Sequence, residues 1–144
     1  MMELREKLRY HFGYASFRTG QEEIIRSVLK KNDTLAMLPT GTGKSLCYQL
    51  PGYILPGSII VVSPLLSLMQ DQVEQLQMRG EKRVIGLNSF LPFNERLAVL
   101  DQLKYYRFIY ISPEMLANRN ILQALKKIPI SLFVVDEAHC ISQW

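Results

Sequence analysis

Short continuous runs of apolar residues alternate along the chain with longer stretches in which apolar positions recur every three or four residues. The runs predict five strands, at residues 34–38, 58–63, 83–87, 108–112 and 131–135. Several runs are apolar at consecutive positions, as in Ile59-Ile60-Val61-Val62. Consecutive apolar positions are typical of strands buried on both faces, so we expect a parallel sheet that is covered by helices on both faces.

The stretches with helical spacing predict a helix before the first strand, at residues 21–30, and helices between the strands, at residues 45–53, 65–78 and 94–104. In the first of them, Ile24, Ile25, Val28 and Leu29 fall on one face. Strands that alternate with helices are the pattern of an α/β protein with a wound sheet. The 144 residues contain no linker, repeat or low-complexity segment, and this length suits one domain.

A glycine-rich turn separates the predicted strand 34–38 from the predicted helix 45–53. Its glycines let the backbone turn sharply and aim N–H groups at phosphate oxygens, and the helix that follows adds the positive end of its dipole. This context indicates a P-loop, although Leu38 stands where the general pattern has glycine. Lys44 can then reach the β- and γ-phosphates, and the Ser45 hydroxyl can bind Mg²⁺. The predicted phosphate-binding residues are Thr40, Gly41, Thr42, Gly43, Lys44 and Ser45.

Two adjacent acids, Asp136 and Glu137, follow the last apolar run directly. Ligands of open α/β sheets bind beyond the carboxyl ends of the strands, where the P-loop is also expected. Asp136 can hold Mg²⁺, and Glu137 can orient and deprotonate the attacking water. His139 can connect the γ-phosphate region to another element. Taken alone, this segment could also be an ordinary acidic turn with a structural histidine; beside a P-loop it favours hydrolysis of ATP with Mg²⁺.

The charge of the chain mildly favours a polyanionic partner. Its formal net charge is +4 and its isoelectric point is about 9.1. The basic residues are spread along the chain, so many of them could simply be solvated helix ends. No apolar run reaches the roughly 18 residues that cross a bilayer, and the N-terminal residues do not resemble a secretory signal. Cys47 and Cys140 lack the spacing of a disulfide framework. We expect reduced thiols, no membrane partner and a cytoplasmic protein, associated with the nucleoid if bacterial.

Taken together, the motifs resemble the RecQ family of DNA helicases, which belong to superfamily 2 and carry a DEAH box. The string Asp136-Glu-Ala-His-Cys-Ile-Ser-Gln-Trp144 is similar to that family beyond the box itself. Four other segments agree in the same order, at residues 12–21, 39–49, 61–73 and 110–114. The resemblance therefore covers nearly the whole chain, and it implies a P-loop NTPase domain of the RecA-like class.

The resemblance also implies roles for individual residues. Tyr14 and Arg18 would sandwich the adenine of ATP, and Gln21 would bond its edge. Tyr14 and Phe17 could instead be core aromatics, and we prefer that interpretation for Phe17. Single-stranded DNA would contact Ser63, Pro64 and Ser67 and, with weaker support, Ser112. Each of these serine segments could also cap a helix, and both roles can hold at once. Trp144 would begin an aromatic loop that couples DNA to hydrolysis, unless it is simply the last residue of this sequence.

By the same resemblance, residues 1–144 form the N-terminal portion of the first RecA-like domain. Residues 1–31 would be a helical lead-in with the adenine motif, and residues 32–144 would run from the P-loop to the DEAH box. The domain would be incomplete at its C-terminal side, and the second motor lobe, with its arginine finger, would be absent. The strand after the Asp-Glu pair would normally fill the centre of the sheet. We therefore expect residues 1–144 alone to be poorly stable and nearly inactive.

For the intact protein, the resemblance implies movement 3′ to 5′ along single-stranded DNA, unwinding of duplex DNA, and a role in repair and recombination. The partners would be single-stranded and duplex DNA and ATP, with a monomer favoured. Two alternatives stay open. One is a different P-loop enzyme, such as a small kinase or a GTPase, although Tyr14, Arg18, Gln21 and the complete DEAH tetrad speak against it. The other is a non-catalytic fragment that binds nucleotide or single-stranded DNA.

Overall fold

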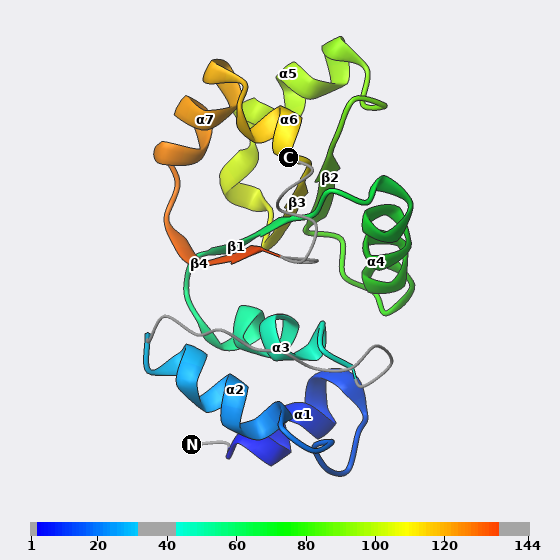
Figure 1. Ribbon diagram of the computed structural model, residues 1–144, viewed down its shortest axis with the longest axis vertical. Helices are drawn as coiled ribbons and strands as arrows, with labels where there is room; N and C mark the ends of the chain where they lie inside the picture. The colour runs from blue at the N-terminus through cyan, green and yellow to red at the C-terminus, as the bar shows by residue number, and fades with distance from the viewer. Residues whose placement is uncertain (1–2, 32–42, 136–144) are drawn as a thin grey trace. The chain divides into compact units, whose positions relative to one another are not determined.

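A computed structural model of the chain describes residues 3–31 and 43–135, which fall into two compact units (Figure 1). The first unit is Met1–Pro56 and the second is Gly57–Trp144. The predicted strand 34–38 and every residue from Asp136 onward lie outside the described residues. No helix in the described ranges has both the length and the apolar character needed to cross a bilayer.

The first unit consists of three helices, α1 (Leu4–Phe12), α2 (Gln21–Leu29) and α3 (Leu46–Ile54). Both α1 and α2 pack on α3. Their shared core contains the buried side chains of Leu8, Phe12, Ile25, Leu46, Cys47 and Leu50. The expected helical lead-in and the predicted helices 21–30 and 45–53 are therefore present. The compact unit extends past the expected boundary at residue 31 because the buried face of α3 packs against α1 and α2.

The start of α2 depends on two local features of the sequence. Gly20 stands at the N-cap with φ 87°, a left-handed conformation that glycine adopts without steric cost. Glu22 and Glu23 occupy the first turn, where negative charge is stabilised by the helix dipole. These features start the helix at Gln21 and hold that residue at the junction of loop and helix.

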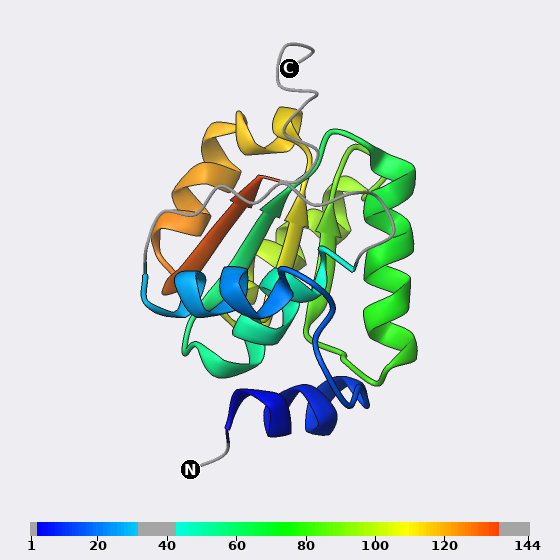
Figure 2. The same ribbon diagram turned by 60° about the horizontal axis from the view of Figure 1, so that its bottom comes forward.

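The second unit is built on a parallel sheet with the strand order β2-β3-β1-β4. Its strands are β1 (Ser58–Val62), β2 (Val84–Leu87), β3 (Phe108–Ile111) and β4 (Ile130–Val135). They match the four predicted strands in this part of the chain to within one residue at each end. Figure 2 shows the four arrows pointing the same way. The prediction of a parallel sheet is therefore confirmed.

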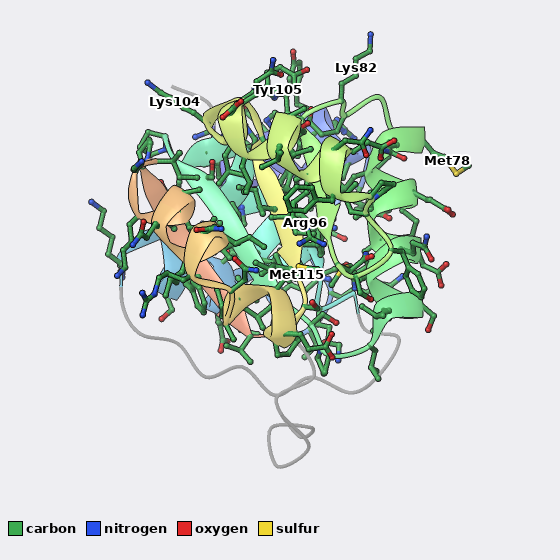
Figure 3. All side chains as sticks on the ribbon, turned by 90° about the horizontal axis from the view of Figure 1, so that it is seen from above. Met78, Lys82, Arg96, Lys104, Tyr105 and Met115 are labelled. Carbon is green, nitrogen blue, oxygen red and sulfur yellow. The ribbon has the colours of Figure 1, made fainter. Side chains whose placement is uncertain are left out.

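Helices cover both faces of this sheet, as the continuous apolar strands predicted. One face carries a core that includes Ile60, Val62, Ile109 and Ile111. It is covered by α5 (Phe93–Asp101), a short 3₁₀ helix (Leu103–Tyr105), α6 (Pro113–Leu116) and α7 (Arg119–Lys126) (Figure 3). On the opposite face, α4 (Leu66–Met78) packs against β2, where Val73 and Met69 lie beside Gly86.

Two parts of the helical layer differ from the prediction. The predicted helix 94–104 ends at Asp101 and is followed by the 3₁₀ turn. Of the apolar positions on its predicted face, Leu100 and Leu103 lie against the core, whereas Leu97 is exposed. The helices α6 and α7 were not predicted. Side-chain caps start both of them: the Ser112 hydroxyl accepts a hydrogen bond from the N–H of Met115, and the Asn118 side chain accepts from Asn120 and Ile121.

The carboxyl ends of the strands lie at one edge of the sheet. Val62 of β1 pairs with Ile111 of β3 on one side and with Val135 of β4 on the other. The β1–β3 ladder continues one residue further, because the N–H of Ser63 donates to the carbonyl of Ile111 at 3.0 Å. Ser63 and Ser112, which follow β1 and β3, therefore lie at a common edge, where an open α/β sheet binds its ligands.

Candidate functional site

Gln21 connects two of the predicted motifs in the first unit. Its side chain is almost completely buried, with 3 % exposed. The Oε1 atom accepts a hydrogen bond of 2.8 Å from the N–H of Arg18, and Nε2 donates one of 2.9 Å to the carbonyl of Gly43. A residue expected at the adenine therefore holds the last glycine of the predicted P-loop, although 22 positions separate the two in the sequence.

Gly43 has to be glycine at this position for two separate reasons. Its φ of +73° lies in the left-handed region, which costs a residue with a Cβ roughly 1–2 kcal/mol. A Cβ at this position would also lie 2.7 Å from Nε2 of Gln21, closer than any normal contact. The tight approach shows that the hydrogen bond between Gln21 and the loop requires the absence of a side chain at position 43.

A matched pair of substitutions separates these two effects. Gly13 has nearly the same φ, +78°, but a Cβ there would meet nothing within 4 Å. We expect Gly13→Ala to cost only the backbone strain, whereas Gly43→Ala should also displace Gln21. In the full-length protein, Gly43→Ala should therefore weaken ATP binding by at least about tenfold relative to Gly13→Ala, since about 1.4 kcal/mol of lost interaction corresponds to a factor of ten.

The measurement is a titration with a fluorescent ATP analogue, combined with thermal unfolding of both variants. Equal ATP affinities of the two variants would show that the contact between Gln21 and Gly43 plays no part in binding nucleotide.

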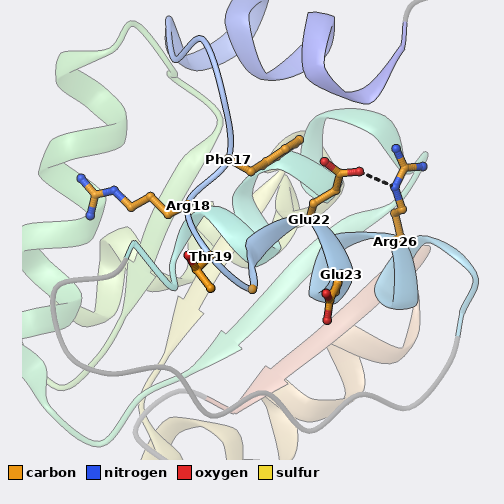
Figure 4. Close-up of a pocket in the computed structure, with 7 residues that line it drawn as sticks. Phe17, Arg18, Thr19, Glu22, Glu23 and Arg26 are labelled. Carbon is orange, nitrogen blue, oxygen red and sulfur yellow. Dashed lines mark hydrogen bonds and ion pairs between the residues drawn. The ribbon is translucent and has the colours of Figure 1, made fainter.

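A surface pocket of about 370 Å³ lies at the start of α2 (Figure 4). The residues lining it come from the loop before the helix and from its first two turns: Phe17, Arg18, Thr19, Gly20, Glu22, Glu23 and Arg26. Glu22 and Arg26 form an ion pair of 3.0 Å at its wall. Arg18, one half of the expected adenine sandwich, thus lines a pocket. Tyr14, the other half of the expected sandwich, is 46 % exposed.

For Phe17 the structure agrees with the preferred interpretation as a core aromatic. It packs against the core of the first unit and also lines the pocket. In Figure 4, Phe17 and Arg18 point in opposite directions from the loop. Neither Glu22 nor Arg26 was predicted as a site residue from the sequence. Their spacing of four residues on the predicted helix, with opposite charges, is the signal that identifies them as neighbours.

Lys44 and Ser45 lie immediately before α3. The backbone turns into the helix there, with hydrogen bonds from Leu46 N to the carbonyl of Gly43 at 3.2 Å and from Cys47 N to that of Lys44 at 3.0 Å. Ser45 stands at the N-cap with helical backbone angles, and its side chain makes no capping hydrogen bond. The hydroxyl of Ser45 is thus not engaged in capping, which fits its predicted role as a metal ligand.

The thiol of Cys47 is buried in α3, directly after these residues. Burial disfavours the thiolate and raises the pKa of Cys47 to about 11. The thiolate is the nucleophile, so at pH 8 only about one thiol in a thousand is reactive. We expect alkylation of the folded protein at Cys47 to be about a hundredfold slower than that of an ordinary thiol, and to accelerate as the pH rises.

Peptide mass spectrometry after timed iodoacetamide treatment measures this rate at Cys47 itself. The same protein in denaturant is the control, in which Cys47 should react at the ordinary rate. Rapid labelling of the folded protein would contradict a buried, inert thiol.

The serines expected at DNA differ in their surroundings. Ser63 and Ser112 are buried, with 2 % and 1 % exposed, and Ser112 caps α6. Ser67 is exposed in the first turn of α4, and Pro64 is partly buried. The alternative that a serine caps α4 is wrong, because Leu65 occupies the N-cap position and no side chain caps this helix. A DNA contact by these segments stays a prediction.

Several predicted site residues lie outside the described residues. They are Thr40, Gly41 and Thr42 of the glycine-rich turn, and Asp136, Glu137, His139 and Trp144 after β4. Among the residues that are described, no group of three or more His, Cys, Asp or Glu side chains is placed to hold a metal ion. Asp136, the acid predicted to bind Mg²⁺, follows β4 in the sequence.

Comparisons with known proteins agree with the motifs. The sequence profile of the family described as DEAD/DEAH box helicase matches residues 18–144. The chain is 58 % identical over 144 residues to a protein of Bacillus subtilis named probable ATP-dependent DNA helicase RecS. It is 44 % identical over 140 residues to the RecQ helicase of the same organism, and 42 % identical over 139 residues to that of Haemophilus influenzae. The resemblance inferred from the motifs is confirmed.

These matches cover the whole of this chain, or nearly so, but only part of each relative. The chain spans 29 % of the Bacillus subtilis RecS protein, and 24 % and 22 % of the two RecQ proteins. Among solved structures, it resembles a hypothetical ATP-dependent RNA helicase from Sulfolobus tokodaii, with a TM-score of 0.71 and 20 % identity. That match covers 99 % of this chain and 43 % of the other, and it supports the fold.

Proposed function

Since the chain belongs to the DEAD/DEAH box helicase family, we propose that it is the ATP-binding part of a DNA helicase of the RecQ type. The observation that carries this proposal is the pair of hydrogen bonds at Gln21, which joins the adenine motif to the end of the P-loop. An identity of 58 % over all 144 residues to a probable DNA helicase supports the same substrate.

The nucleotide would be held at both of its ends. Arg18 and Tyr14 would sandwich the adenine, and Gln21 would bond its edge. Because Gln21 also donates a hydrogen bond to Gly43, a contact between Gln21 and the base would directly affect the phosphate loop. Lys44, with the backbone of residues 40–43, would bind the phosphates and stabilise the charge that develops on them during hydrolysis.

The two acids would divide the remaining tasks. Asp136 and the Ser45 hydroxyl would hold Mg²⁺, which when bound neutralises charge on the phosphates. The absence of a cap bond at Ser45 fits this role. Glu137 would orient the attacking water and take its proton, and His139 would connect the site to the rest of the motor. In the intact protein, ATP hydrolysis would open and close the cleft between the two motor lobes and so move the single-stranded DNA.

Single-stranded DNA would lie at the carboxyl edge of the sheet. The N-terminus of α4 points its first N–H groups away from the helix body, and these groups suit a backbone phosphate. Ser67 is exposed in that first turn beside Pro64, while Ser112 marks the end of the neighbouring strand. Trp144 would add a stacking surface for a base. We further propose 3′-to-5′ movement, unwinding of duplex DNA in repair and recombination, and a cytoplasmic monomer.

The deciding experiment compares nucleotides and DNA in the full-length protein. ATP turnover should exceed GTP turnover and should rise when single-stranded DNA is added, and a duplex with a 3′ tail should be unwound faster than one with a 5′ tail. A small kinase or GTPase would show no stimulation by single-stranded DNA. A non-catalytic protein would bind single-stranded DNA, with salt-dependent affinity, but would hydrolyse nothing.

A further inference from the structure

Another pocket, of about 240 Å³, lies in the second unit beside the end of β2. Its walls come from α4, from the turn that joins β2 to α5, and from the first turn of α5. They include Met69, Gln70, Asn88, Phe90 and Glu95. The volume is below the roughly 300–1,000 Å³ of pockets that hold drug-sized ligands, so the pocket suits a small, flat group.

Phe90 offers such a group an aromatic surface. The residue lines the pocket and is nevertheless 71 % exposed. The side chain of Asn88 fixes the turn that carries it, because Oδ1 of Asn88 accepts a hydrogen bond of 2.8 Å from the N–H of Phe90. The carbonyl of Asn88 also accepts from the N–H of Leu91 at 3.1 Å. An aromatic ring held in this way at the border of a pocket can stack on a flat ligand.

The other walls of the pocket add polar groups. Asn88 is only 7 % exposed, and within the described ranges the acceptor for its Nδ2 atom is the sulfur of Met69, at 3.7 Å. A thioether is a weak acceptor, and an amide nitrogen carries two N–H donors, so Nδ2 can donate to a ligand. Glu95 is exposed and brings a carboxylate, which only accepts hydrogen bonds. A flat face with a donor and an acceptor beside it matches a nucleobase, whose edge carries both.

The pocket also lies at the edge of the sheet where single-stranded DNA is expected. Val62 and Leu87 both pair with Ile111, so β1 and β2 end at the same level and Asn88 follows at the carboxyl edge. Ser67 stands one helical turn before the α4 residues that line the pocket. One turn spans about 5.4 Å, which is less than the distance from a phosphate to the base of the same nucleotide. A strand with a phosphate at the start of α4 would therefore have a base within reach of Phe90.

We propose that this pocket takes one unpaired base of single-stranded DNA, which stacks on Phe90 while Asn88 and Glu95 bond its polar edge. This inference rests on the proposed function, because it extends the expected path of the DNA. Cytosine, adenine and guanine carry an amino group that can donate to Glu95, whereas thymine carries none. The pocket therefore favours cytosine over thymine, which has a ring of the same size. The polar groups in the walls distinguish it from a groove for an apolar segment of a protein partner.

The first test measures the affinity of the full-length protein for single-stranded DNA by fluorescence anisotropy. Phe90→Ala should weaken binding about tenfold, as is typical of losing one stacked base. The loss should be the same at every salt concentration, since the ring contacts no phosphate. The thermal unfolding midpoint should not fall, because the ring is largely exposed. The matched control is Phe93→Ala, which removes a ring that is 67 % exposed and is not among those lining the pocket, and which should bind DNA like the wild type.

Two further measurements identify the ligand as a base. A strand that contains the fluorescent base 2-aminopurine should lose fluorescence when it stacks in the wild type, and should keep it with Phe90→Ala. Phe90→Leu, which stays apolar but has no flat face, should behave like Phe90→Ala. The wild type should bind cytosine oligomers more tightly than thymine oligomers of equal length. Glu95→Ala should abolish that ratio, whatever it does to the overall affinity.

The outcomes separate this inference from the proposed function. Equal DNA affinities of Phe90→Ala and Phe93→Ala would overturn the inference, as would wild-type binding by Phe90→Leu, which is the result expected of a groove for an apolar protein segment. A cytosine preference that survived in Glu95→Ala would overturn the part assigned to Glu95. All of these results can occur in a protein that hydrolyses ATP and responds to single-stranded DNA. A wild type without ATP turnover, or without stimulation by single-stranded DNA, would overturn the proposed function itself.

Discussion

Replacement of Lys44 by alanine in the full-length protein is expected to lower ATP turnover by about 10²- to 10³-fold. This is the effect of removing one group that stabilises transition-state charge in a site shielded from water. Lys44 follows Gly43 directly, and the carbonyl of Gly43 accepts a hydrogen bond from Gln21. This bond fixes the backbone from which the Lys44 side chain extends. Turnover should be measured at saturating ATP and single-stranded DNA, and ATP affinity should be titrated separately.

Lys82→Ala is the matched control, because this lysine is exposed and points outward from the second unit in Figure 3. It should leave turnover unchanged. If Lys44→Ala retained more than about a tenth of wild-type turnover, the glycine-rich turn would not be the phosphate site that the family membership implies.

Glu137→Gln should have an effect at least as large, about 10²- to 10⁴-fold on turnover, because it removes the proposed general base and keeps the shape of the side chain. Its effect on ATP binding should be small or even favourable, since the amide removes the negative charge that the proposed base would bring near the phosphates. This combination distinguishes Glu137 from Lys44, whose loss should also weaken binding. A rapid-mixing measurement of single-turnover hydrolysis, beside an ATP titration, separates the two effects.

Glu74→Gln provides the control for the loss of a carboxylate, because Glu74 is exposed on α4. We expect it to behave as the wild type in both measurements. A Glu137→Gln variant that turned over ATP at the wild-type rate would assign the general base to another residue, and the pH profile of the remaining activity would then report the pKa of that residue.

The link between Gln21 and Gly43 suggests how base recognition reaches the phosphates. Adenine bound to the Gln21 amide would compete with, or tighten, the hydrogen bonds that join Gln21 to Arg18 and to Gly43. A nucleotide with a different base would disturb the same amide and hence the loop. The preference for ATP would then be expressed in the hydrolysis rate as well as in affinity.

The sequence alone was sufficient for the elements whose signal is local. The runs at residues 58–63, 83–87, 108–112 and 131–135 became parallel strands, as their continuous apolar pattern predicts. The central strands β1 and β3 are buried along their whole length, whereas β4 at the edge of the sheet is partly exposed. The helices α2, α3 and α4 began within one residue of their predicted starts. The family, too, was recognised from short motifs, since phosphate and metal chemistry restrict which residue types can stand at each position.

Tertiary structure decided what depends on neighbours that are distant in the sequence. No pattern in the chain shows that Gln21 bonds to Gly43, because that contact arises only when α2 and α3 pack together. Composition could not distinguish Ser63, Ser67 and Ser112 either. The Ser63 hydroxyl is buried without a described partner, and Ser67 is exposed. The Ser112 hydroxyl caps a helix. The type of a side chain sets what it can bond, but only the packing around it determines which of those bonds can form.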